Sequence, residues 1–406
     1  MNADSARLDS FYDVVIVGGG IMGACTAYSI ARRFEEEGLG RRVMLCEQFS
    51  FGHKRGSSHG SSRIIRKSYH ESFYVRMMGR AYMLWDEAQA EANCKVITRT
   101  GGLDFVLEGS EIETKLKESM KSAGVEFSVL DLKSLSDRFP GFSMPPGFVC
   151  IQSGDAGVVN ASSACEMFRC LARRHGAITA ENLTVESWTA AEVVDLTGKR
   201  LQGKLLRTSR GVVHASRIVC TAGAWTAKLL GRQNLTLDPI NTTVVYWKTK
   251  EGSDPGVYQA EKNAPVFIVY ADPKEPHGVL NAYGTPAIEY PGLIKFCLHS
   301  GSSCSPEDRL CIPNLQDIEE KLKDLTRTFL PHVDVENHVA AEACMYNNTR
   351  DENFILDVLS DNTVLGCGFS GHGFKFGPLI GELLCSLALD EEPEFSLEPF
   401  SARRFS

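Results

Sequence analysis

The chain has 406 residues, which is more than one hydrophobic core usually supports, so we expect two domains. Hydrophobic residues make up 43% of the sequence and charged residues 23%, a composition typical of a soluble globular protein. The formal net charge of −8 at pH 7 argues against a nucleic-acid-binding protein, because such proteins need a large basic surface.

The first residues, 1–12, are polar and mixed in charge, so we expect no secretory signal there. Residues 14–31 are uncharged and long enough to suggest a membrane span, but their glycine cluster favours a strand, a turn and a helix. The 13 cysteines lack C-x-x-C pairs, which indicates free thiols in a reducing compartment rather than a disulfide framework or a metal site.

A strand, a glycine-rich turn and a helix are predicted at the start of the globular chain. The β-branched run 14–17 is typical of a buried parallel strand, and an alanine-rich helix follows. Between them, Gly18, Gly20 and Gly23 form a G-x-G-x-x-G motif. In such motifs the first glycine permits a tight turn, the second lets the backbone approach a pyrophosphate, and the third allows close packing of helix and strand.

A second predicted strand, 42–46, ends at an acidic residue, Glu47. The pyrophosphate would lie at the helix N-terminus, and Glu47 is placed to accept hydrogen bonds from a ribose diol. A glycine motif alone is a weak signal, but the order of strand, motif, helix, strand and acid favours dinucleotide binding over an ordinary turn. The motif does not choose between NAD and FAD.

Basic and small residues alternate in the segment 55–67, directly after the second strand. Arg63 and Arg66, three positions apart, could share one helical face or line one wall of a pocket. The alternative is a solvated basic loop, but Ile64 and Ile65 suggest partial burial. Because a buried arginine needs an anionic partner, a flavin phosphate or a substrate carboxylate would fit.

The middle of the chain is predicted to alternate between two domains. We interpret residues 98–150 as an excursion into a second domain, containing a strand and an exposed charged helix. The chain then returns to the first domain, with Asn160 as the predicted N-cap of a helix to Ala172. The predicted strands that follow are 182–188, 211–215 and 217–225. The last of these ends in small residues, which a cofactor could approach.

From residue 238 to about 343 we expect an antiparallel or mixed sheet that covers the redox ring of the cofactor. Its predicted strands are 244–247, 266–270, 279–283 and 292–299, and one amphipathic helix is marked by Leu315, Ile318, Leu322, Leu325 and Phe329. On the last strand, Lys295, Cys297 and His299 share one face. That face meets either water or a polar cavity, and periodicity alone slightly favours water.

The last module contains two short strands and a glycine-rich turn, 368–378, that opens a final helix to residue 389. The partial positive charge at this helix N-terminus suits the pyrimidine end of a flavin, where reduction builds negative charge.

Several segments together resemble the family of monomeric sarcosine oxidases and L-pipecolate oxidases, which are flavoprotein amine oxidases. The resemblance covers nearly the whole chain and rests on these segments: 56–66, 221–225, 283–286, 292–295, 344–346 and 368–376. It implies a Rossmann-like, glutathione-reductase-like FAD-binding domain (1–97, 151–237 and 344–406) and an α+β substrate domain on a mixed or antiparallel sheet (98–150 and 238–343).

The resemblance also implies roles for individual residues. Cys344 matches the cysteine that bonds covalently to FAD, although an ordinary buried cysteine is the alternative. Lys295 matches the lysine that activates dioxygen, and Arg66 with Lys375 matches the pair that holds the substrate carboxylate. Further catalytic residues would be Arg63, Tyr283, His299 and His372, and further cofactor contacts would be Ser58, His59, Val185, Gly371 and Lys375. Cys297, between Lys295 and His299, would narrow the pocket, react with peroxide, or be a silent neighbour.

The implied activity is oxidation of the C–N bond of a small secondary amino acid to an imine, with dioxygen reduced to hydrogen peroxide. Sarcosine, L-pipecolate and L-proline are the candidate substrates, and no nucleic acid or membrane partner is expected. The protein is expected to be monomeric and peroxisomal or cytosolic, since the final residues, Arg404-Phe-Ser406, differ from a Ser-Lys-Leu signal. Two alternatives are a nicotinamide-dependent dehydrogenase and a catalytically silent flavin-binding sensor or scaffold.

Overall fold

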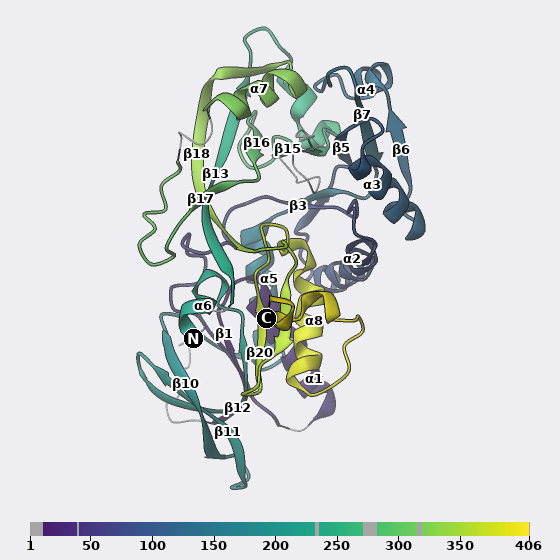
Figure 1. Cartoon of the computed structure of the whole chain (residues 1–406). Coiled ribbons are helices and arrows are strands. Elements are labelled where there is room, and N and C mark those ends of the chain that lie inside the picture. The colour runs from purple at the N-terminus through teal and green to yellow at the C-terminus, as the bar shows by residue number, and fades with distance from the viewer. Residues whose placement is uncertain (1–10, 39, 232–234, 271–281, 315–318, 406) are drawn as a thin grey trace.

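Two β-sheets organise the structure, a computed structural model that describes residues 11–38, 40–231, 235–270, 282–314 and 319–405. Each sheet forms the centre of one half of the molecule, and Figure 1 shows the two halves one above the other. The small three-stranded sheet that completes the described part consists of β3 (Arg63–Ile65), β8 (Gly157–Val159) and β4 (Ile97–Arg99).

The first sheet has eight strands and is mostly parallel at its centre. Its path runs β10-β11-β12-β1-β2-β9, and β20 pairs with both β12 and β19. The strands are β1 (Phe11–Val17), β2 (Val43–Cys46), β9 (Ile178–Ala180), β10 (Val185–Val194), β11 (Arg200–Thr208), β12 (Gly211–Cys220), β19 (Ile355–Val358) and β20 (Thr363–Cys367). Val17 pairs in register with Cys46 on one side and Cys220 on the other. The residues that follow these three strands therefore emerge at the same edge of the sheet.

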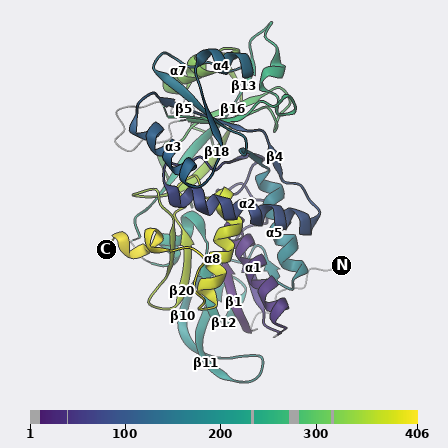
Figure 2. The ribbon, with the colours of Figure 1, turned by 90° about the vertical axis from the view of Figure 1, so that its right-hand side faces the viewer.

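Three helices lie on one side of this sheet, as Figure 2 shows, and the first of them packs against the other two. They are α1 (Ile21–Glu37), α5 (Ala161–Arg174) and α8 (Gly377–Ala388), and α2 (Ser72–Ala92) contacts the last two. The predicted cap of α5 is confirmed, because the side chain of Asn160 accepts a hydrogen bond from Ser163 N at 3.0 Å. The predicted helix after the glycine motif is confirmed as well.

The second sheet has nine strands in the order β17-β13-β16-β15-β14-β5-β7-β6, with β18 paired to β13. They are β5 (Gly102–Leu107), β6 (Phe127–Leu130), β7 (Phe148–Ser153), β13 (Leu237–Thr249), β14 (Val266–Val269), β15 (Ala282–Thr285), β16 (Ile294–Leu298), β17 (Gly301–Ser303) and β18 (Val333–Thr349). The helices of this half are α3 (Glu111–Ser122), α4 (Leu132–Arg138) and α7 (Glu319–Phe329).

Short helical turns complete the described elements. A turn of 3₁₀ helix, η1 (Gly223–Trp225), precedes α6 (Thr226–Leu229) after β12, and η5 (Phe374–Phe376) leads into α8. The other 3₁₀ turns are η2 (Pro255–Tyr258), η3 (Ala260–Lys262), η6 (Glu398–Phe400) and η7 (Ala402–Phe405). In the part of the chain that is described, no helix combines the length and apolarity needed to span a membrane. All 13 cysteines are free thiols.

The structure corrects one expectation from the sequence. The slight preference for water around Lys295 and Cys297 is wrong, since both side chains are buried on β16. Of the two arrangements considered for Arg63 and Arg66, the shared helical face is excluded, because Arg63 begins strand β3, whereas both residues do line a cavity. Strand β11 was not among the predicted strands; it includes two basic side chains and one amide side chain before residue 205. The interval 279–281 and the positions of Leu315 and Ile318 lie outside the described residues.

The predicted division into domains stays a prediction. Strand β18 crosses its last boundary, because the strand belongs to the second sheet and runs to Thr349, beyond residue 343. Cys344 lies on this strand. The second half of the molecule therefore supplies Cys344 to the cavity that it shares with the first half.

Candidate functional site

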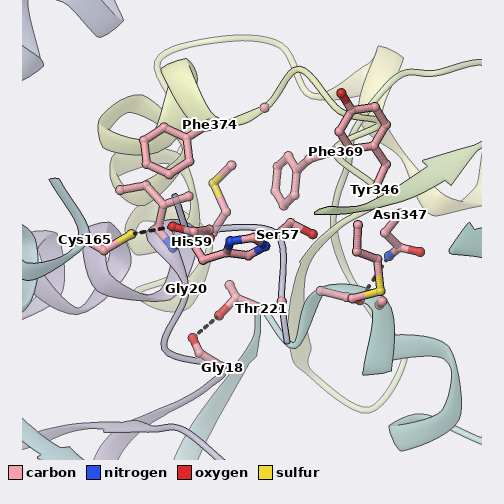
Figure 3. A pocket seen from close by; sticks show the side chains of 18 of the residues that line it. Gly18, Gly20, Ser57, His59, Cys165, Thr221, Tyr346, Asn347, Phe369 and Phe374 are labelled. Carbon is pink, nitrogen blue, oxygen red and sulfur yellow. Dashed lines mark hydrogen bonds between the residues drawn. The ribbon is translucent and has the colours of Figure 1, made fainter. Parts of the chain in front are cut away.

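One cavity of about 480 Å³ connects the two halves of the molecule. It is lined by the residues that follow β1, β2 and β12 in the first sheet and by residues of β15, β16 and β18 in the second. In the view of Figure 3, His59 lies between Thr221 and Phe374. The predicted site residues that line the cavity are Gly18, Gly20, Glu47, Ser58, His59, Arg63, Arg66, Val185, Tyr283, Lys295, His299, Cys344, Gly371, His372 and Lys375.

The glycine turn after β1 forms one end of the cavity. Gly18 has a positive φ of 110°, and a Cβ added to it would lie 2.4 Å from the carbonyl oxygen of Thr221. The Thr221 hydroxyl donates a 3.0 Å hydrogen bond to the Gly18 carbonyl, which joins the ends of β1 and β12 (Figure 3). Gly23 does not line the cavity. A Cβ there would lie 1.9 Å from the Gly18 carbonyl oxygen, so this glycine permits the close packing of helix on turn.

Glu47 lies beside this turn, at the end of β2. Its Oε2 accepts a hydrogen bond from Gly19 N at 2.9 Å, and its Oε1 accepts one from Phe49 N at 3.0 Å. Burial alone would raise the pKa of Glu47, but hydrogen bonds from His53 and these two backbone groups lower it overall. The carboxylate is therefore charged and held at the cavity wall, with free lone pairs to accept further hydrogen bonds.

A thiol and a guanidinium meet near the middle of the cavity. Arg63 Nη2 lies 3.8 Å from Cys344 Sγ and donates hydrogen bonds to the carbonyl oxygens of His59, at 2.6 Å, and Ser57, at 3.0 Å. Burial would raise the pKa of Cys344, yet hydrogen bonding by His59 and the charge of Arg63 lower it to about 6. The thiolate is therefore the main form of Cys344 at neutral pH, and thiolates are strong nucleophiles.

Two buried cations, Arg66 and Lys375, lie near the far end of the cavity. Arg66 Nη1 donates to the Ser68 hydroxyl at 3.2 Å, and its guanidinium stacks over the Tyr69 ring at 4.3 Å. Lys375 Nζ donates to the Tyr69 hydroxyl at 2.9 Å and to the His372 carbonyl at 2.6 Å. These hydrogen-bond acceptors are all neutral. Burial and the charge of Arg66 therefore lower the pKa of Lys375 well below its usual value.

Two histidines and two tyrosines share this region. Burial, Lys375 and Arg66 lower the pKa of His299 to about 4, and burial with Lys375 lowers that of His372 well below its usual value. Both imidazoles are therefore neutral at physiological pH. Tyr283 and Tyr346 project from neighbouring parts of the second sheet, and the Tyr346 hydroxyl donates to the Tyr283 hydroxyl at 3.2 Å.

Lys295 projects from β16 into the same cavity and is only 4% exposed. Its Nζ lies 3.0 Å from the Ser62 hydroxyl oxygen and 3.4 Å from Glu289 Oε1. Glu289 lies behind Lys295 and does not line the cavity.

Cys297, which shares the face of Lys295, does not line the cavity either. Its sulfur lies 3.3 Å from Val245 N, and burial raises the pKa of its thiol to about 11. Of the three interpretations of Cys297, the silent neighbour fits this environment best.

Sequence reasoning missed several residues that build the site. Tyr346 could have been found, because it follows Cys344 by two positions on a strand and so shares its face. Ser62 lies within the basic segment that drew attention to Arg63. Tyr69 had no local signal, since its partner Lys375 is 306 positions away in the sequence. Glu289 also contacts Ser62 and Tyr246, which lie far from it in the sequence.

This lining suits a dinucleotide that ends in a reactive ring system. The bare backbone at Gly18 and the charged Glu47 could hold the phosphates and a ribose, and the thiolate of Cys344 could hold the ring. The two cations at the opposite end could hold a small anion beside that ring.

The sequence model of the family described as FAD dependent oxidoreductase matches residues 13–387. A human protein described as peroxisomal sarcosine oxidase is 35% identical, over 98% of this chain and 98% of its own length. A probable sarcosine oxidase from Arabidopsis thaliana is 34% identical, over 98% of this chain and 93% of its own length. Among solved structures, the L-proline dehydrogenase from P. horikoshii matches with a TM-score of 0.78 at 21% identity, covering 98% of both chains, which supports the same fold.

Proposed function

The chain belongs to the FAD-dependent oxidoreductase family, and we propose that it oxidises the C–N bond of small secondary amino acids with dioxygen as the electron acceptor. Sarcosine is the first substrate to test, since relatives along the whole chain are described as sarcosine oxidases. L-Proline and L-pipecolate are the other candidates.

The cation pair Arg66 and Lys375 is the observation that carries this proposal. Both groups are buried, line the cavity and donate their hydrogen bonds to neutral oxygens. The buried carboxylate of Asp104 offsets part of the charge of Arg66, and two cations side by side still favour a further anion between them. The α-carboxylate of an amino acid supplies that charge, and it would fix the substrate with its C–N bond toward the centre of the cavity.

The same charges favour the neutral form of the substrate amine, which is the form that can be oxidised. An ammonium group would be repelled by Arg66, Lys375 and Lys295, whereas the neutral imidazoles of His299 and His372 add no further charge. FAD, when bound, supplies the two-electron acceptor for this oxidation. The product is an imine, which water can hydrolyse or which remains cyclic when the substrate is a ring.

Cys344 is proposed to attach the FAD covalently. A thiolate with a pKa of about 6, held beside Arg63, is a nucleophile at neutral pH without an additional base. Gly18, Gly20, Glu47, Ser58, His59, Val185 and Gly371 are proposed to contact other parts of the cofactor, with Gly23 packing behind them.

Lys295 is proposed to promote the reaction with dioxygen. Reduction of dioxygen creates negative charge, and a buried ammonium on the cavity wall stabilises that charge as it forms. Hydrogen peroxide is the expected product. We further propose a monomer in the peroxisome or the cytosol.

The test is a visible spectrum of the purified protein before and after acid precipitation, followed by anaerobic addition of each amino acid. Yellow colour that remains in the pellet and bleaches with sarcosine, L-proline or L-pipecolate supports the proposal. Colour that leaves the pellet contradicts attachment at Cys344. Absence of colour from protein made with ample flavin favours a nicotinamide-dependent dehydrogenase, and a flavin that none of the amino acids bleaches favours a silent flavin-binding protein.

A further inference from the structure

We propose that Glu289 is a positioning residue that holds Lys295 in its charged form and aims it at the cavity. This inference rests on the proposed function, because it concerns the lysine assigned to the dioxygen step. Glu289 lies on the connection between β15 and β16, six residues before Lys295 in the sequence. The connection folds back so that the carboxylate reaches the lysine of its own hairpin.

The carboxylate of Glu289 is enclosed by donors. Its Oε1 accepts hydrogen bonds from Lys295 Nζ, at 3.4 Å, and from the Ser62 hydroxyl. Its Oε2 accepts one from the Tyr246 hydroxyl at 2.7 Å. The side chains of Lys295 and Glu289 are 5% and 6% exposed, so water screens this pair very little. An ion pair this deeply buried must be well hydrogen-bonded to persist, and this one is.

The backbone also fixes the direction of the pair. Lys295 lies opposite Thr285 in the β15–β16 hairpin and opposite Tyr246 on β13, so strands flank it on both sides. The ring of Tyr246 packs edge-on against Tyr290, whose hydroxyl donates to Glu342 at 2.6 Å. Glu289 therefore has little freedom, and Lys295 is held between this carboxylate and the cavity.

A second lysine in the same cavity, Lys375, has no carboxylate among its hydrogen-bond partners in the described part of the chain. Lys375 has only neutral hydrogen-bond acceptors and a neighbouring arginine, and its pKa is lowered well below the usual value. Lys295 is equally buried but has Glu289 as a partner. The titratable and charged groups around the pair are Arg63, Tyr246, Tyr290, Cys297 and Glu342. Among the described residues, Glu289 is the carboxylate that forms an ion pair with Lys295.

The consequence concerns the dioxygen step alone. Conversion of dioxygen into hydrogen peroxide takes two electrons and two protons; reduced FAD, when bound, would supply both electrons and one proton, and water would supply the other proton. A lysine that stays charged keeps its stabilising effect at alkaline pH. Without the carboxylate, the neutral amine becomes favoured as pH rises, and the cation is lost from the cavity wall.

The first experiment measures the two half-reactions of the FAD-loaded enzyme by stopped-flow over a range of pH. In Glu289→Gln, reduction by substrate should keep its rate and pH dependence. The rate of reoxidation by dioxygen should become dependent on pH. On the alkaline side this rate should fall about tenfold per pH unit, as expected when one proton is lost. Tyr246→Phe is the matched control, because it removes a donor to the same carboxylate but leaves the charge. Glu289→Asp keeps the carboxylate, so its pH profile of reoxidation should resemble that of the wild type.

The second experiment needs no turnover. The melting temperatures of the FAD-loaded wild type, Glu289→Gln, Lys295→Met and the double variant form a double-mutant cycle. If the pair is an ion pair, Glu289→Gln leaves a buried charge without a partner. The additional Lys295→Met change should then recover part of the lost melting temperature.

A Glu289→Gln enzyme that reoxidises with the wild-type pH profile, together with additive changes in melting temperature, would overturn the inference. Should this variant fail to fold, Glu289→Ala, which also removes the carboxylate, tests the same profile against the wild type. Failure of the wild type to be reduced by any of the amino acids would contradict the proposed function instead, and the melting-temperature cycle would still decide whether Glu289 and Lys295 are coupled.

Discussion

The guanidinium of Arg63 lies 3.8 Å from the sulfur of Cys344, although 281 positions separate the two residues in the sequence. Arg63 begins β3 in the small sheet, whereas Cys344 lies on β18 of the nine-stranded sheet. The contact therefore exists only when both parts of the chain are folded against each other. It also places a permanent positive charge beside a thiol, which is the arrangement that converts a buried cysteine into a reactive one.

Replacing Arg63 by Gln should slow the covalent attachment of FAD. In the wild type, attachment should increase with pH through about 6, where Cys344 loses its proton, and level off above that value. Without the guanidinium the pKa of the thiol rises and the titration moves to higher pH. The measurement is the fraction of yellow colour in acid-precipitated protein after FAD is added to cofactor-free chain at several pH values. Cys344→Ala should remain colourless in the pellet, and Cys297→Ala, which changes a thiol outside the cavity, should behave as the wild type.

Carboxylate binding should weaken as pH rises, because Lys375 must be charged to bind it. The pKa of Lys375 is lowered without a ligand, and an adjacent carboxylate would raise it again, so binding takes up a proton. Above the pKa of the free enzyme, the Kd of a carboxylate that carries no amine, such as propionate, should increase about tenfold per pH unit. Spectral titration of the bound flavin measures this Kd. Lys375→Met should bind more weakly and lose the slope, and a wild-type Kd that is constant with pH would contradict the assignment.

The dinucleotide end of the site could be predicted from local sequence, because its parts lie within one strand–turn–helix–strand unit. Gly18, Gly23 and Glu47 all belong to this unit and are separated by fewer than thirty positions. Gly19 and Glu47, which are hydrogen-bonded, are 28 positions apart. The spacing follows from the geometry of the strand–turn–helix–strand unit. At the other end, the sequence alone suggested an anion beside Arg63 and Arg66, but the roles of Cys344 and Lys375 required the resemblance to a family. Nothing in the periodicity around Cys344 or Lys375 distinguishes them from ordinary buried residues.

The prediction that Lys295 and Cys297 on β16 face water was wrong, and the reason lies in residues outside this strand. Lys295 and Cys297 alternate with apolar residues, a pattern that both water and a polar cavity produce and that slightly favours water. The choice depends on Ser62, which approaches from another segment, on Glu289 in the connection before the strand, and on the flanking strands β13 and β15. Tyr69 is a similar case, since its hydroxyl meets Lys375 across 306 positions.

Replacing Lys295 by Met should slow reoxidation strongly and leave substrate reduction nearly intact. The substitution keeps an unbranched side chain of similar length but removes the charge that is proposed to stabilise reduced dioxygen, and charge stabilisation of this kind typically changes rates by about a hundredfold or more. Anaerobic reduction followed by mixing with dioxygen separates the two half-reactions. An equal loss in both would mean that Lys295 acts on the substrate or on the fold.

A final prediction concerns stability at a site far from the cavity, where His175 joins three helices. Its Nε2 lies 2.7 Å from Glu91 Oε1 on α2, and its Nδ1 is hydrogen-bonded to Glu35 on α1. Burial lowers the pKa of His175, but the hydrogen bonds and charges of the two glutamates raise it overall. The folded protein therefore binds a proton here more tightly than the unfolded chain does.

This stabilisation is complete below the pKa of an unfolded histidine, about 6.5, and is lost as pH rises through the higher pKa of the folded state. The melting temperature of the wild type should fall over that interval relative to His175→Gln, which lacks the titrating group. His338→Gln, a change at an exposed histidine on β18, should keep the wild-type profile. Parallel pH dependences of the melting temperature for wild type and His175→Gln across this range would show that the two glutamates do not stabilise the charged imidazole.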